Sequence, residues 1–277
     1  MANAARTDLA AEAQRLWSQT EEDGRLPAGV SVREEELLGL PVQTVEIGNE
    51  DAARRLGKAP GRYYSLTLPR HAGRGGAEFT QSVTALRELI ARCLDRRPQT
   101  GLAAALGNPD ITPDALGPLC ASQLLVTRHL KQQDEAAWRA FAPVSLIRPG
   151  VLGTSGVESA EQIRALCRCV RPELVIVVDA LAGAEAAALC RSLQVCDSGI
   201  SPGAGVCNDR ARIDRAYLGV PVTAVGVPTV TDAAPGLFVT PRDIDSAVRE
   251  CARVVAYGIN LALHPGLTLG DIDALVG

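Results

Sequence analysis

Two aspartates follow apolar segments of this sequence, in positions where carboxyl groups can do acid–base chemistry. Asp179 ends the run Leu174–Val178, whose composition is typical of a strand buried on both faces. An ionised carboxylate at the end of a buried strand is costly unless a site uses it. Ligands of open α/β sheets bind just beyond the carboxyl ends of strands. Asp114 follows a second apolar run, Leu102–Leu106, after a Gly-Asn-Pro break, so the sequence predicts both side chains at one edge of a sheet.

Such a pair could hydrolyse an amide bond. Two acids that share a site cannot both ionise easily, so the pKa of one of them rises. The charged member, which we assign to Asp114, would act as a base on water. The protonated member, Asp179, would donate a proton to the carbonyl oxygen or the leaving amine. The sequence allows the reverse assignment equally well.

Three alternatives stay open at this stage. Asp114 also fits the first turn of a helix after Thr112 and Pro113, where its charge complements the helix dipole, and sequence alone slightly favours this simpler role. The two aspartates could hold a divalent metal that activates water, although no matching histidine is evident. They could also recognise a partner in a non-catalytic binding module. Activity in the presence of a chelator distinguishes hydrolysis by the two carboxyl groups alone from hydrolysis by a bound metal.

Other residues around these two segments are candidates for substrate binding or for supporting the pair. Asp197 ends a short apolar stretch, 193–196, that we expect at the periphery of the sheet, and it is the nearest alternative to the pair. The glycine-rich loop 199–208 matches neither dinucleotide-binding nor P-loop patterns, and fits a wide turn that lets a backbone approach closely, such as an extended peptide. The candidate residues in these loops are Asn108, Asp110, Asp197, Gly203, Gly205 and Asn208.

Composition excludes several classes of protein. A net charge of −4 gives no basic field for nucleic acid. No apolar run approaches the roughly 20 residues of a membrane span, and the N-terminus has no secretory signal, so we expect a soluble intracellular protein. The eight cysteines lack a CxxC pair and are expected as reduced, buried side chains. We expect no metal ligands and no cofactor.

Strand and helix patterns alternate from residue 79 to 263, which predicts one α/β domain with a mostly parallel sheet. Buried strands are expected at about 102–106, 144–147, 174–178 and 222–227. A pair of strands is expected at 42–47 and 63–68. Helices are expected at 5–18, 79–95, 115–130, 241–263 and, from a capping box at Ser155 and Glu158, to about Val170. The Ala-rich segment after Asp179 is also predicted to be helical.

Several long segments together resemble one known family: RTDLAAEA at 6–13, a GKxxGxY pattern at 57–63, LGNPDITPDALGP at 106–118, IRPGVLGTSGVESAE at 147–161, LVIVVDALA at 174–182, CDSGISPGAGVCN at 196–208 and LGVPVTAVGVPTVTDA at 218–233. Nearly the whole chain, from Arg6 to 267, is similar to the germination proteases of spore-forming bacteria.

This resemblance implies an endopeptidase that degrades small acid-soluble spore proteins, with Asp114 and Asp179 as the two acids of an atypical aspartic protease. It implies a three-layer fold similar to the peptidases that mature nickel hydrogenases. It also implies a self-processing zymogen, a homotetramer, and a location in the cytoplasm of the forespore and spore core, without direct contact to nucleic acid or membrane. We expect a single domain over 1–277 with a short propeptide near residues 1–15.

The chain departs from the family pattern in three places. Only five residues precede Arg6, so a propeptide must be short or must include RTDLAAEA itself. Cys207 stands where a glycine is expected. The regions around 69–77 and 231–241 are shorter than expected, which makes the chain compact for the family.

Overall fold

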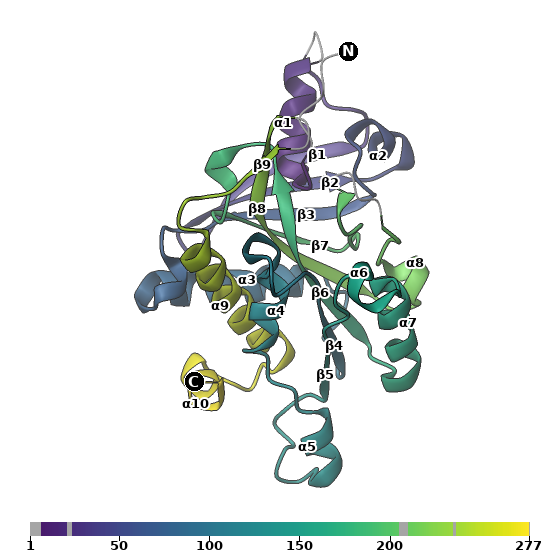
Figure 1. Ribbon diagram of the computed structural model, residues 1–277, viewed down its shortest axis with the longest axis vertical. Coiled ribbons are helices and arrows are strands. Elements are labelled where there is room, and N and C mark those ends of the chain that lie inside the picture. Colours follow the sequence, from purple (N-terminus) through teal and green to yellow (C-terminus); the bar gives the residue numbers. More distant parts are fainter. Residues whose placement is uncertain (1–6, 21–23, 205–209, 235–236, 277) are drawn as a thin grey trace.

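A mixed β-sheet runs through the molecule (Figure 1). The computed structural model describes residues 7–20, 24–204, 210–234 and 237–276. Within these residues the sheet has nine strands in the order β1-β2-β3-β7-β8-β6-β4-β5, with β9 paired to β8. The strands are β1 (Val30–Leu37), β2 (Leu40–Ile47), β3 (Gly61–Thr67), β4 (Gly101–Ala105), β5 (Val144–Ile147), β6 (Leu174–Gly183), β7 (Ser192–Cys196), β8 (Val222–Ala234) and β9 (Leu237–Val239).

The four predicted buried strands form the parallel part of this sheet. They lie side by side in the order β8, β6, β4 and β5, with Leu102 opposite Val175 and Val175 opposite Val222. All five residues of β4 and the first six of β6 are buried, because helices cover both faces. The α/β class and these strands are therefore confirmed. Their carboxyl ends meet at one edge, which is where the two candidate aspartates were expected.

An antiparallel part extends the sheet beyond β8. The predicted pair of strands is confirmed as β2 and β3, which run antiparallel with Val45 opposite Tyr63. The acidic segment 30–37 forms the outermost strand, β1. The expectation that 193–196 lies at the periphery is wrong, since β7 pairs with β3 on one side and with β8 on the other.

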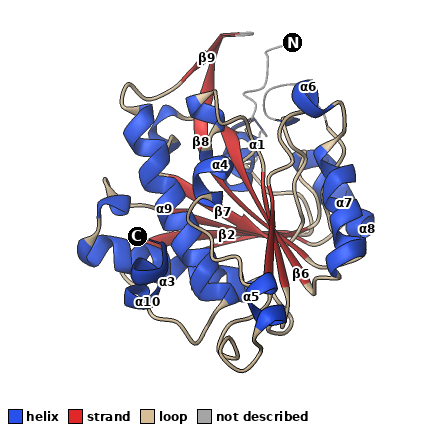
Figure 2. Ribbon diagram, turned by 60° about the horizontal axis from the view of Figure 1, so that its bottom comes forward, coloured by secondary structure: helices blue, strands red, loops and turns tan. Residues whose placement is uncertain are grey.

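Helices cover the sheet on both sides. In Figure 2, α3 and α9 lie on one side of the strands and α7 and α8 on the other. The first side packs Leu86, Leu89 and Val255 onto the sheet, and the second packs Ile163 and Leu218. The helices are α1 (Ala10–Thr20), α2 (Glu50–Leu56), η1 (Ala72–Arg74), α3 (Gly76–Arg92), η2 (Thr112–Asp114), α4 (Leu116–Ala121), α5 (Arg128–Gln133), α6 (Leu152–Ser155), α7 (Ser159–Val170), η3 (Ala186–Ala188), α8 (Arg215–Leu218), α9 (Ile244–Leu263) and α10 (Leu269–Val276).

The predicted helix after Asp179 does not form. Strand β6 continues through Asp179 to Gly183, because the long strand β8 offers it pairing partners as far as Thr231. Only the short 3₁₀ turn η3 follows. The helix propensity of alanine is worth a few tenths of a kcal/mol per residue, which is less than the pairing of a buried strand contributes.

The long helix predicted at 115–130 is replaced by two short ones, α4 and α5. The chain between them is held by the buried side chain of Asn260 on α9. Its Oδ1 accepts a hydrogen bond from the Leu125 main-chain N–H at 2.9 Å, and its Nδ2 donates to the Gln123 carbonyl at 2.9 Å. A contact made by a residue 135 positions away thus decides where the helix ends.

The predicted capping box at Ser155 and Glu158 is wrong. Ser155 is the last residue of α6, and its Oγ accepts a hydrogen bond from the Val157 main-chain N–H at 3.2 Å. Gly156, with a φ of 68°, separates the two helices. Helix α7 begins at Ser159 with Glu158 as its N-cap, and the side chain of Glu158 makes no cap hydrogen bond.

None of the helices within the described ranges is both long enough and apolar enough to cross a bilayer. Most of the described cysteines are buried thiols, as expected, with Cys169 as an exposed exception. Cys207 lies outside the described residues.

Candidate active site

A cavity of about 660 Å³ lies at the carboxyl edge of the parallel strands. Both predicted aspartates, Asp114 and Asp179, line it, and so does Asp8 from the N-terminal segment. Much of the remaining wall is apolar, including Leu106, Ile111, Leu152, Leu181 and Phe238. An apolar wall with a few polar groups is the usual composition of a ligand site.

Asp179 is buried in the wall of this cavity, at 5% exposure. It lies on β6 directly opposite Gly226 of β8. Its Oδ1 accepts a hydrogen bond from the Ala180 main-chain N–H at 3.0 Å. Burial raises the pKa of the Asp179 carboxyl well above its usual value, and the negative charges of Asp114 and Asp8 raise it further. Asp179 is therefore the member of the pair that holds its proton more tightly.

Asp114 reaches the cavity from the turn after β4, and it lies in the 3₁₀ helix η2 instead of the first turn of an α-helix. Its Oδ2 accepts a hydrogen bond from the Asn108 main-chain N–H at 2.7 Å. Partial burial raises the pKa of the Asp114 carboxyl, and that hydrogen bond opposes the rise. Gly107 has a φ of 110°, and a Cβ there would lie 2.0 Å from the Asp114 carbonyl oxygen. The glycine thus permits the close turn that places Asp114.

The other candidates in these loops serve mainly to shape them. The Asn108 side chain accepts a hydrogen bond from the main chain of Asp110 at 3.0 Å, and Asp110 itself is exposed. Neither residue lines the cavity, whereas Gly203 does. Gly205 and Asn208 lie outside the described residues.

Asp197 lies away from the pair. Strand β7 runs antiparallel to β8, so its carboxyl end points to the opposite edge of the sheet. There Asp197 accepts hydrogen bonds from the main-chain N–H and the Nε of Arg62, both at 2.7 Å. This ion pair leaves Asp197 as a structural partner of β3, and it is not among the residues that line the cavity.

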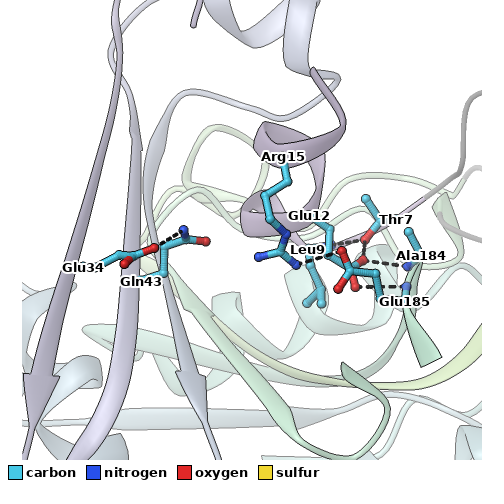
Figure 3. A network of polar contacts seen from close by, with 8 residues as sticks. All are labelled: Thr7, Leu9, Glu12, Arg15, Glu34, Gln43, Ala184 and Glu185. Atoms are coloured by element: carbon cyan, nitrogen blue, oxygen red, sulfur yellow. Dashed lines mark hydrogen bonds and ion pairs between the residues drawn. The ribbon is translucent and has the colours of Figure 1, made fainter. Parts of the chain in front are cut away.

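The N-terminal segment is the part of the site that the sequence did not predict. Asp8 and Ala182 exchange two hydrogen bonds of 2.8 Å, from the Asp8 N–H to the Ala182 carbonyl and from the Ala182 N–H to the Asp8 Oδ2. Glu12 is buried, and its carboxylate accepts from the main-chain N–H groups of Ala184 at 2.6 Å and Glu185 at 3.2 Å (Figure 3). The signal was available, since both acids lie in the RTDLAAEA segment that carries the family resemblance.

No group of three or more histidine, cysteine, aspartate or glutamate side chains is arranged to hold a metal ion within the described part of the chain. Asp8, Asp114 and Asp179 all place carboxyl groups along the cavity, and of the predicted pair Asp179 holds its proton more tightly.

Comparisons with known proteins identify the family. A family model described as germination protease matches residues 5–236. A germination protease of Clostridium perfringens is 34% identical and covers 97% of this chain and 98% of its own length. This chain belongs to the germination protease family. It is accordingly a peptidase of spore germination.

Other germination proteases show similar identity. That of Caldanaerobacter subterraneus is 34% identical over 98% of both chains, and that of Bacillus cereus is 36% identical over 96% of this chain and 74% of its own. The alignment with the Clostridium perfringens protein spans 323 positions, whereas this chain has 277 residues, so the alignment leaves gaps in this chain.

A solved structure of the hydrogenase maturation protease HycI from Thermococcus kodakarensis is also similar, with 20% identity over 64% of this chain and 97% of its own. Its TM-score is 0.39. Similarity at this level carries no argument about the activity.

Proposed function

We propose that this chain is an endopeptidase that degrades small acid-soluble spore proteins, with Asp114 and Asp179 as its catalytic pair. The observation that carries the proposal is that both carboxyl groups line one cavity and that burial raises the pKa of each. Catalytic acids and bases are often found with such perturbed pKa values.

The unequal environments support a division of roles. Asp114, which is less buried and accepts the Asn108 N–H, takes a proton from a water molecule. That water attacks the carbonyl carbon of the peptide bond. Asp179, which holds its proton more tightly, donates it to the nitrogen of the leaving amine. The C–N bond breaks, which leaves Asp114 protonated and Asp179 ionised. Transfer of a proton from Asp114 to Asp179 then restores the starting state.

The family resemblance also supports a zymogen and a homotetramer in the cytoplasm of the forespore and spore core. Asp8 lines the cavity of the full chain, so loss of an N-terminal piece that includes it would change access to the pair.

The test is incubation of the purified protein with a small acid-soluble spore protein, with and without a metal chelator. We expect cleavage in both cases. Loss of cleavage with the chelator, restored by a divalent metal, would favour a metal held by the two aspartates. Absence of cleavage under all conditions, with binding retained, would favour a non-catalytic binding module.

We expect Asp114→Asn and Asp179→Asn each to lower kcat by at least about 10³-fold, because the two acids act as one unit and their losses do not add. The double variant should therefore be no slower than either single one. Asp110→Asn serves as the matched control, since Asp110 is an exposed carboxylate of the same loop. Near wild-type cleavage by a folded single variant would remove that residue from the mechanism.

A further inference from the structure

One row of paired residues crosses four neighbouring strands of the sheet and includes Asp179. Ser65 of β3 is opposite Gln194 of β7, Gln194 is opposite Gly226 of β8, and Gly226 is opposite Asp179 of β6. Paired residues present their side chains to the same face of a sheet. Gln194 and Asp179 therefore lie on one face, two strand spacings or about 10 Å apart.

Gln194 is a buried amide whose two polar groups both bind main chain. Its Nε2 donates to the Asp8 carbonyl at 3.2 Å, and its Oε1 accepts from the Ala10 N–H at 2.8 Å. The side chain is 6% exposed, and a buried amide is costly unless its donors and acceptors are bonded. Contacts of this kind recognise a peptide backbone and ignore the identity of its side chains.

Lys58 makes a third contact to the same stretch of main chain. It belongs to the GKxxGxY segment and follows Gly57, the C-cap of α2. Its Nζ donates to the Thr7 carbonyl at 2.7 Å. Burial lowers the pKa of the Lys58 ammonium, while the nearby charges of Asp8 and Glu12 oppose that shift.

The backbone that these side chains hold leads directly into the candidate active site. Asp8, Lys58 and Gln194 line a small cavity of about 100 Å³, and Asp8 and Leu181 are shared with the large cavity of the catalytic pair. Ala182, near the end of β6, also binds this backbone through its two hydrogen bonds with Asp8.

We propose that Gln194 and Lys58 bind the main chain of an extended peptide substrate, and that residues 7–10 occupy this place in the full chain. The inference rests on the proposed peptidase function and adds two substrate-positioning residues to it.

The kinetic test compares the N-terminally processed forms of Gln194→Met and the wild type, in which residues 7–10 no longer compete with the substrate for Gln194. Methionine keeps the length of the side chain and removes both hydrogen bonds. Because these bonds are made equally in the bound substrate and the transition state, KM for a small acid-soluble spore protein should rise on the order of tenfold while kcat stays within about twofold. Lys58→Met should act in the same direction. Ser65→Ala, a buried substitution directly opposite Gln194, should leave both constants unchanged.

A second measurement does not depend on cleavage. In the full-length Asp179→Asn protein, hydrogen exchange at the Ala10 N–H reports whether residues 7–10 remain docked. Adding the spore protein should accelerate this exchange, because the substrate displaces the segment from Gln194. The same addition should have a smaller effect in Asp179→Asn, Gln194→Met, whose segment is already released.

The outcomes separate the two proposals. An unchanged KM in Gln194→Met, together with a lowered Tm, would show that Gln194 only caps the start of α1 and would overturn the inference while leaving the peptidase function intact. Displacement of the segment by a spore protein that the wild type never cleaves would refute the proposed function and keep the inference. Absence of both displacement and cleavage would refute both.

Discussion

At the scale of single residues, the proposed catalytic role of Asp179 comes at a cost in stability. The pKa of Asp179 is raised in the folded protein, so the folded state favours its protonated form. This contribution to the free energy of unfolding is fully present below the unfolded pKa near 3.8 and is lost as pH rises through the folded pKa. At neutral pH the folded protein therefore carries a cost that it would avoid with a neutral side chain.

We predict that Asp179→Asn abolishes cleavage and yet unfolds at the same or a higher temperature than the wild type at pH 7. The difference in Tm should shrink towards pH 3, where the wild-type carboxyl is protonated in both states. Calorimetry at the two pH values measures it. A variant that is markedly less stable at pH 7 would contradict the sign of this argument.

Gly107 permits the turn that carries Asp114, and a single substitution can test this role. Gly107→Ala places a Cβ against the Asp114 carbonyl and at a positive φ, so we expect a loss of about 2 kcal/mol or more in stability and a large fall in kcat. Gly156→Ala is the control. Its φ is also positive, 68° against 110° at Gly107, and nothing lies within 4 Å of the added Cβ, so it should cost about 1 kcal/mol and leave kcat unchanged. Equal kcat values for the two variants would argue against a role of Gly107 in placing Asp114.

At the scale of elements, the strands that depend on local sequence patterns could be predicted. The features that depend on contacts between distant residues could not. The buried strands could be predicted because their apolar runs are continuous, and Asp114 and Asp179 because each follows such a run. The helix expected at 115–130 could not be corrected from its own residues, because Asn260 of α9 interrupts it. Likewise the place of Asp197 depends on the direction of β7, which no local pattern contains.

Asn260 offers a test of that account. Asn260→Ala leaves the Leu125 N–H and the Gln123 carbonyl without their partner in a buried place, so we predict a loss of about 2–4 kcal/mol in the free energy of unfolding. Denaturant titration measures it. Ser246→Ala, on the exposed first turn of the same helix, should change stability by less than about 0.5 kcal/mol. Comparable values for both would show that Asn260 does not hold the 123–125 segment.

At the scale of the whole molecule, residues 7–12 are bound into the site. Leu9 and Ala10 are each 1% exposed, and the contacts of Asp8, Glu12 and Lys58 fix the segment to three strands or loops. Processing of such a chain must release these contacts as well as cleave a bond.

We predict that the full-length protein is inactive or weakly active and that loss of an N-terminal piece activates it. N-terminal sequencing of the active enzyme should show a new start. Blocking cleavage with Asp179→Asn should leave the original start in place, provided that the protein processes itself. Full activity with Met1 or Ala2 still present would contradict this prediction.

The hydrogen bonds between the start of the chain and β6 and β7 also order events during synthesis. Asp8 bonds to Ala182 and Ala10 bonds to Gln194, which follow them by 174 and 184 residues. At about 5–20 residues per second, a ribosome needs roughly 10–40 s to reach these partners after the first turn of α1 has been made. The first residues to be translated are thus among the last that can dock. Because the row of paired residues also needs Gly226, a nascent chain cannot assemble the cavity that Asp114 and Asp179 line until most of its length has emerged.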